Sequence, residues 1–219
     1  KADLPTSVGQ AYLRQGKEEQ AAAAYAAAVV AQPGHAPALL GEARLKAGRG
    51  DLPGALALLD SALEKQPRLY DAWQLKGDLF AAQGDAAAAT NAYRKALEIK
   101  PDYLPAHSAI VRILLAEGKL DDAGKQIEVL RQIAPNHPQT QYLRAMLAYQ
   151  QKDYAAARDA ILLHLKVVPE SPLGLQLAGL IEYDSQAYPQ AEAYLLKALP
   201  RTPPLSIARR VLIASYLRN

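Results

Sequence analysis

The four histidines and the carboxylates are the side chains of this 219-residue chain that could hold a metal or transfer a proton. No two of the histidines have the spacing of metal ligands on one helix face, such as i and i+4. They are His35, His107, His137 and His164. The chain contains no cysteine, which excludes disulfides, thiolate metal sites and cysteine nucleophiles within it. We therefore expect no metal site and no cofactor.

The aspartates lie where helices are expected to begin. Asp51, Asp85, Asp153 and the pair Asp121–Asp122 each stand at a turn that precedes a helical stretch. There a carboxylate caps free backbone N–H groups and interacts favourably with the helix dipole. A catalytic pair would need two acids that converge in a pocket, and the glycines do not form a phosphate-binding loop. We predict no catalytic residue and no enzymatic activity in this chain.

A 34-residue interval organises the whole chain. Prolines recur at this interval, and a ladder of alanines keeps the same register without an insertion or deletion. The prolines are Pro33, Pro67, Pro101, Pro135, Pro169 and Pro203; the alanines are Ala21, Ala55, Ala89, Ala123, Ala157 and Ala191. The interval predicts six repeats, followed by one helix over 206–219. The repeats cover residues 2–35, 36–69, 70–103, 104–137, 138–171 and 172–205.

The third repeat shows the motif most clearly. It reads YDAWQLKGDLFAAQGDAAAATNAYRKALEIKPD from Tyr70 to Asp102. Its motif residues are Trp73, Gly77, Phe80, Ala89, Tyr93, Ala96 and Pro101. Their spacing resembles that of the tetratricopeptide repeat, a helix–turn–helix unit of 34 residues. The resemblance implies an all-α, right-handed solenoid in which helix A and helix B of each repeat pack together.

Small and large residues alternate at the expected seam between the two helices. Gly77 lets helix A approach helix B, while Trp73, Phe80 and Tyr93 fill the space that the small residues leave. Pro101 cannot continue helix B and so ends the repeat. His164 occupies a small-residue position of the fifth repeat, and we expect it to distort the packing or to reach solvent.

In the tetratricopeptide family the second, fifth, ninth and twelfth residues of each repeat line a concave groove, where proteins or peptides bind. These spacings place the residues on one helical face. In the N-terminal half they are polar: Gln10, Arg44, Gln74, Asp78, Ser108 and Arg112. In the C-terminal half they are apolar or aromatic: Tyr142, Met146, Tyr149, Leu180 and Tyr183.

Tyrosine and methionine are common at adaptable binding surfaces. We predict that a partner contacts Tyr142, Met146, Tyr149, Leu180 and Tyr183, and that Arg44, Asp78 and Arg112 contribute charge. In the alternative interpretation, the aromatic residues only pack between repeats and the three charged residues form an inter-repeat ion ladder. The lysine and asparagine pair of chaperone-binding tetratricopeptide domains is absent, since Gln74 and Asp78 stand at those positions.

Nucleic acid is not an expected partner. The net charge is only +3, and the RNA-binding pentatricopeptide family has a 35-residue repeat and a strongly basic groove. No apolar run is long enough to span a bilayer.

The last third of the chain has a narrower resemblance. The segments LAGLIEY (Leu177–Tyr183), YPQAEAYLLKAL (Tyr188–Leu199) and ARRVLIASYLR (Ala208–Arg218) resemble the large tetratricopeptide lipoprotein found beside exosortase and PEP-CTERM sorting genes. That resemblance implies an exported protein of Gram-negative bacteria, at the periplasmic or outer-membrane surface, linked to exopolysaccharide production or protein sorting. A cytoplasmic scaffold is the alternative. Two other functions stay open: a regulatory or substrate-presenting module of a larger enzyme, and direct carbohydrate binding.

The ends of the chain suggest a piece of a longer array. The first residue is Lys1, and we expect any lipid anchor to lie upstream of it. In the last helix, Leu212, Ile213 and Tyr216 stand where a following helix B would cover them. We expect a trimmed seventh repeat rather than a natural cap. The chain would then be a monomer or associate weakly end to end.

Overall fold

The computed structural model describes residues 2–201, 206–216 and 218. These residues form thirteen α-helices and one short 3₁₀ helix, with no strand among them. The chain divides into two compact units, one ending at residue 106 and the other beginning at residue 107. We describe each unit by itself.

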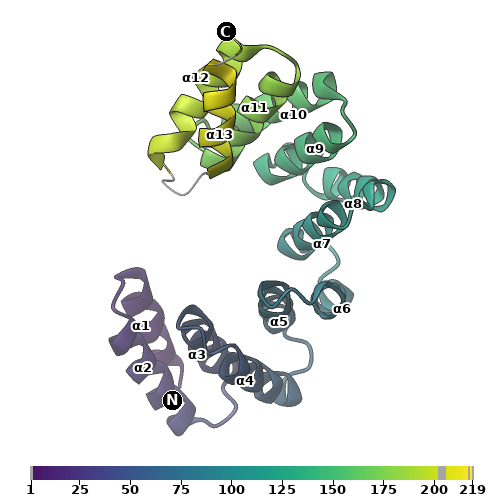
Figure 1. Cartoon of the computed structure of the whole chain (residues 1–219). Helices are drawn as coiled ribbons and strands as arrows, with labels where there is room; N and C mark the ends of the chain where they lie inside the picture. Colours follow the sequence, from purple (N-terminus) through teal and green to yellow (C-terminus); the bar gives the residue numbers. More distant parts are fainter. Residues whose placement is uncertain (1, 202–205, 217, 219) are drawn as a thin grey trace. The chain divides into compact units, whose positions relative to one another are not determined.

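The N-terminal unit contains three helical pairs. Each pair packs side by side, α1 with α2, α3 with α4 and α5 with α6 (Figure 1). The helices are α1 (Asp3–Arg14), α2 (Glu18–Ala31), α3 (Ala36–Gly48), α4 (Leu52–Lys65), α5 (Tyr70–Ala82) and α6 (Ala86–Ile99). Contacts between α2 and α3 and between α4 and α5 join successive pairs.

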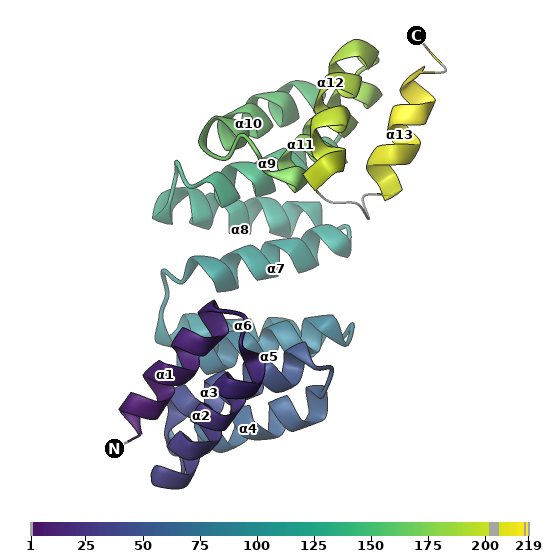
Figure 2. The ribbon, with the colours of Figure 1, turned by 90° about the vertical axis from the view of Figure 1, so that its left-hand side faces the viewer.

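The C-terminal unit is also built from helical pairs. Helix α9 packs on α10, α11 packs on α12, and α10 contacts α11 (Figure 2). The helices are α7 (Leu104–Ala116), which begins before the boundary, α8 (Leu120–Ile133), α9 (Pro138–Gln150), α10 (Tyr154–Val167), α11 (Pro172–Asp184), α12 (Tyr188–Ala198), η1 (Leu199–Arg201) and α13 (Ser206–Tyr216). Pro203 of the proline ladder and the predicted repeat end at Leu205 lie outside the described residues. The exact repeat boundaries stay a prediction.

The turns inside the helical pairs confirm the predicted roles of the aspartates. The side chain of Asp85 accepts a hydrogen bond of 2.9 Å from the backbone N–H of Ala88 and so caps α6. Asp51 caps α4 and Asp153 caps α10 in the same way. The pair Asp121–Asp122 lies in the first turn of α8.

The seam between paired helices matches small residues to large ones. An added Cβ at Gly77 would lie only 2.5 Å from Cε1 of Tyr93, whose side chain is buried. Equivalent contacts join Gly9 to Tyr25 and Gly179 to Leu195. In the other repeats the same two repeat positions hold Ala43 and Leu59, Val111 and Ile127, and Ala145 and Ile161, all of them buried. A small residue at the first position leaves room for a large one at the second where the contact is observed, as at Gly77 and Tyr93.

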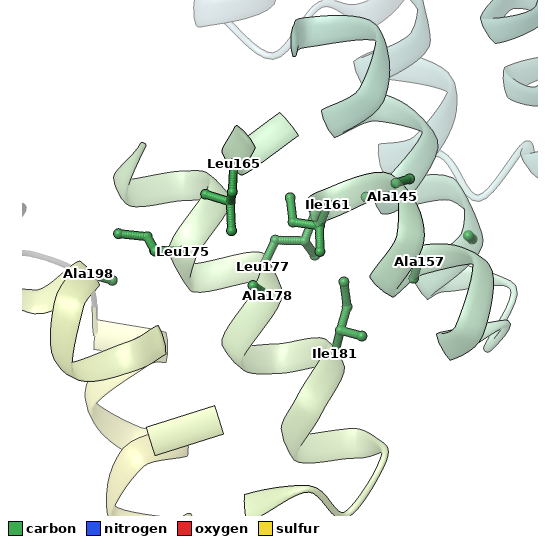
Figure 3. Close-up of a cluster of buried hydrophobic side chains, with 11 residues drawn as sticks. Ala145, Ala157, Ile161, Leu165, Leu175, Leu177, Ala178, Ile181 and Ala198 are labelled. Carbon is green, nitrogen blue, oxygen red and sulfur yellow. The ribbon is translucent and has the colours of Figure 1, made fainter. Parts of the chain in front are cut away.

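The core of the C-terminal unit holds α9, α10 and α11 together. Ile161 of α10 and Leu177 of α11 lie next to each other where the two helices meet (Figure 3). Ala145, Ile181 and Ala198 belong to the same buried cluster. This packing sets the separation of α9 and α11, on which the candidate site is built.

His164 is buried in this unit, so the expectation that it could reach solvent is wrong. Its Nδ1 lies 2.9 Å from the backbone oxygen of Pro138, and its ring contacts Tyr142. The room for this ring comes from Gly174 in the next repeat, where an added Cβ would lie 2.6 Å from the imidazole Cδ2.

The last helix is partly covered. Leu212 is buried against Leu195 and Ala208, contrary to the expectation that only a following helix would cover it. Ile213 and Tyr216 are more than half exposed. Within the described parts of the chain, no helix is long and apolar enough to cross a membrane.

Candidate functional site

A pocket of about 210 Å³ opens between α9 and α11 of the C-terminal unit. Every residue of its lining comes from these two helices. They are Tyr142, Met146, Tyr149 and Gln150 of α9 and Leu173, Gln176, Leu177 and Leu180 of α11.

Four of the eight predicted site residues line this pocket together. Tyr142, Met146 and Tyr149 occupy successive turns of α9, and Leu180 faces them from α11. This arrangement follows from their spacing of three and four residues, which keeps them on one helical face.

The sequence prediction missed the other half of the lining. Leu173 and Gln176 are the second and fifth residues of the sixth repeat, so the family pattern could have identified them. Gln150 and Leu177 stand at other repeat positions, and no signal in the sequence singled them out.

The two tyrosines of the pocket are held in place by neighbours in adjacent helices. The ring of Tyr142 packs against His164, with 5.4 Å between the ring centroids. The hydroxyl of Tyr149 donates a hydrogen bond of 2.5 Å to the carboxylate of Asp184. Burial and then this hydrogen bond raise the pKa of Tyr149 well above its usual range. Both rings are therefore fixed before any ligand arrives, which lowers the entropy cost of binding.

The opposite wall combines an apolar surface with one unpartnered polar group. The side-chain oxygen of Gln176 is buried and has no hydrogen-bond partner among the described residues. Leu173 remains 56% exposed although it belongs to the lining. The pocket can therefore take an apolar group at its mouth, whereas the Gln176 oxygen is covered by the protein itself.

Tyr183 lies beyond the pocket. Its ring packs on the ring of Tyr188, with 5.6 Å between the two centroids. The guanidinium carbon of Arg218 lies 5.5 Å from the centroid of the Tyr183 ring. The predicted aromatic surface thus separates into a pocket with Tyr142 and Tyr149 and a second cluster around Tyr183.

The three charged residues of the prediction do not form the ion ladder that was the alternative interpretation. Asp78 accepts hydrogen bonds from Gln74 at 3.0 Å and from the hydroxyl of Tyr93 at 2.8 Å. Arg44 and Arg112 are exposed. Among the described residues, none of the three takes part in an ion pair. Asp78 anchors a buried tyrosine instead.

No cluster of three or more histidine or acidic side chains that could hold a metal ion occurs in the described ranges. The four histidines lie in separate turns and seams. His107, for example, is buried and hydrogen-bonded to Gln126.

Two family models described as tetratricopeptide repeat match the chain, over residues 40–103 and 80–147. A curated relative is the cellulose synthase operon protein C of Pseudomonas fluorescens (strain SBW25). It is 30% identical over 148 residues, which cover 64% of this chain and only 12% of that protein. The chain thus spans a small part of this relative.

Solved structures share the fold. The Pseudomonas aeruginosa pilF structure has a TM-score of 0.82 at 20% identity and covers 97% of this chain and 96% of that chain. A chain of the APC/C hetero-tetramer Cut9–Hcn1 has a TM-score of 0.87 at 16% identity, over 98% of this chain and 43% of that chain. At these identities the likeness concerns the fold alone.

The helical pairs, the seam residues and these matches agree, and they confirm the all-α solenoid that the repeat interval predicts. Tetratricopeptide repeats are present over residues 40–147, where the two family models match, as the motif of the third repeat predicts.

Proposed function

We propose that this chain is a non-catalytic scaffold that binds a segment of another protein in the pocket between α9 and α11. The observation that carries the proposal is the convergence of Tyr142, Met146, Tyr149 and Leu180 on one open pocket. Its rings are fixed by packing and hydrogen bonds, so the surface is formed before a partner binds. Tetratricopeptide repeats commonly serve protein interaction, which supports this function.

We place the scaffold in the bacterial cell envelope, in machinery for exopolysaccharide production or protein sorting. Two findings support this placement: the name of the cellulose synthase operon relative and the resemblance of residues 177–218 to the exosortase-associated lipoprotein. A periplasmic or outer-membrane location, with a lipid anchor outside this chain, follows from the same proposal. A cytoplasmic scaffold is the alternative.

Direct carbohydrate binding fits the pocket less well. A sugar presents many hydroxyl groups, and a site for it needs several polar partners. Here the hydroxyl of Tyr149 is already bonded to Asp184, and most of the lining is aromatic or aliphatic. Titration with soluble glycans, followed by calorimetry, would distinguish the two functions.

The proposal is tested by capturing partners from a cell-envelope extract of the source organism with two matched leucine variants. Leu173→Glu places a charge at the pocket mouth, where the side chain is 56% exposed. Leu196→Glu places the same charge on α12, where the leucine is 50% exposed and does not line the pocket. Both residues are exposed enough that neither variant should disturb the core.

We expect the wild-type chain and Leu196→Glu to capture the same protein, and Leu173→Glu to lose it at unchanged helicity. Mass spectrometry of the captured proteins gives the readout. Equal recovery by all three chains would show that the pocket is not the binding surface.

A further inference from the structure

The size and lining of the pocket indicate how much of a partner it can hold. Its volume of about 210 Å³ is smaller than the range of about 300–1,000 Å³ found for sites of drug-sized ligands. Met146, Leu177 and Leu180 make its surface apolar. A single large apolar side chain, rather than a whole small molecule, matches this space.

A carboxylate borders this pocket at the end where α9 and α11 finish. Asp184 follows Leu180 by four residues, which places both on one face of α11. Its Oδ2 accepts a hydrogen bond of 2.5 Å from the hydroxyl of Tyr149, which is itself a lining residue. The wall of the pocket therefore continues from Leu180 and Tyr149 directly into the carboxylate.

This carboxylate is open to a further partner. Asp184 is exposed, and the bond from Tyr149 uses only one of its two oxygens. Among the described residues, Asp184 takes part in no ion pair. Arg218 is bonded to the hydroxyl of Tyr188 instead, and the exposed Lys152, in the turn after α9, does not pair with Asp184 either. Asp184 therefore keeps a negative charge without a counter-ion beside the pocket.

The ends of the two helices also favour a cation at this place. Helix α11 ends at Asp184 and α9 ends at Gln150, and the bond from Tyr149 to Asp184 joins these two ends. Backbone carbonyl groups give a helix C-terminus a partial negative charge, which a nearby cation stabilises. Neither α9 nor α11 has a basic residue in its last turn. Glu182, also in the last turn of α11, is already paired with Arg158 through two contacts of 2.7 Å.

We propose that the pocket recognises a protein segment in which a large apolar residue has a lysine or an arginine beside it. The apolar side chain enters between Met146 and Leu180, and the cationic side chain pairs with the second oxygen of Asp184. Leu180 and Asp184 are one helical turn apart, about 5.4 Å along the axis, a distance that neighbouring side chains of one segment can span. This inference rests on the proposed function, because it specifies the partner of the same pocket.

The test uses short fluorescein-labelled peptides and the full chain, with binding followed by fluorescence anisotropy. Three peptides share a central leucine, and its neighbours on both sides are lysines, serines or glutamates. A fourth replaces the central leucine of the basic peptide by serine.

Two variants that remove the same charge are compared. Asp184→Asn lies beside the pocket, and Asp159→Asn lies on α10, where the aspartate is exposed and does not line the pocket. The amide oxygen of an asparagine can still accept the hydroxyl of Tyr149. Asp184→Asn therefore removes the charge without releasing this ring.

We expect the basic leucine peptide to bind most tightly and the acidic one most weakly. Asp184→Asn should weaken the basic peptide by about two- to fivefold, an effect that salt reduces, because an exposed ion pair contributes modestly. The same variant should leave the affinity of the serine-flanked peptide unchanged. Asp159→Asn should leave the affinity of the basic peptide unchanged, and loss of the central leucine should abolish binding.

Equal binding of the basic, neutral and acidic leucine peptides would overturn the inference but leave the proposed function intact. An unchanged affinity of the basic peptide for Asp184→Asn would do the same. Absence of binding by all of the peptides would also overturn the inference. The proposed function would then be judged by the capture experiment with Leu173→Glu.

Discussion

The seam between α5 and α6 allows a prediction in which two known effects oppose each other. Replacing Gly77 by alanine adds a methyl group that would lie 2.5, 2.6 and 2.9 Å from three atoms of the Tyr93 ring. The ring cannot easily move aside, because it is 1% exposed and its hydroxyl is bonded to Asp78. The substitution therefore forces the two helices apart.

The sizes of the two opposing effects decide whether Gly77→Ala stabilises or destabilises the fold. Alanine is preferred over glycine inside a helix by about 1 kcal/mol. Overpacking of a filled core costs about 1–3 kcal/mol, and three contacts this short against a fixed ring place the cost near the upper end. We expect Gly77→Ala to lower the free energy of unfolding of this region by about 2 kcal/mol.

Urea denaturation followed by tryptophan fluorescence measures this directly. Trp73 is the only tryptophan of the chain, it lies on α5 with Gly77, and its indole N–H donates to the oxygen of Pro67. The matched control is Gly48→Ala, at the end of α3, where an added Cβ meets nothing within 4 Å. This control should be neutral or slightly stabilising. A second variant, Gly77→Ala with Tyr93→Leu, reproduces the Ala43 and Leu59 pair and should recover part of the loss. If Gly77→Ala proved as stable as the wild-type chain, the account of the seam would be wrong.

Two further predictions concern contacts between helices. Glu182→Gln removes the negative charge from the pair with Arg158 and should lower the free energy of unfolding by about 1–2 kcal/mol. The loss should be smaller than for a fully buried pair, because Arg158 is partly solvated. Thermal unfolding followed by circular dichroism measures the change, and an unchanged midpoint would contradict the role of the pair. Burial, and then the hydrogen bond to Asp71, raise the pKa of Tyr103 to about 12. The folded state therefore keeps this proton above the ordinary pKa of 10.0, so the stability that it contributes is present below pH 10 and is lost as the pH rises towards 12. Tyr103→Phe should remove one late-titrating tyrosine from the absorbance titration at alkaline pH, and an unaltered titration curve would refute the assignment.

Features that depend on spacing along one helix could be predicted from the sequence. The 34-residue interval predicts the helical pairs, and the aspartates before α4, α6 and α10 become caps because capping involves residues only three apart. Tyr142, Met146 and Tyr149 share a face for the same reason.

Features that depend on contacts between repeats could not be predicted in this way. His164 fits its tight seam because Gly174, in the next repeat, provides space, and no local pattern shows that match. The hydroxyl of Tyr149 finds Asp184 thirty-five residues away. The ion ladder does not form because Asp78 is bonded to Tyr93, on the other helix of its own pair.

The central claim, that the pocket between α9 and α11 binds a partner, can be tested at its centre with one NMR signal. Met146 is the only methionine of the chain and lines the pocket, so methyl-labelled methionine gives a single reporter there. A Met146→Leu variant assigns the signal. Titration of the wild-type chain with the captured partner should shift this signal in a saturable way, and Leu173→Glu should abolish the shift. Capture of the partner by the wild-type chain while the Met146 signal stays unmoved would place the partner elsewhere and contradict the account.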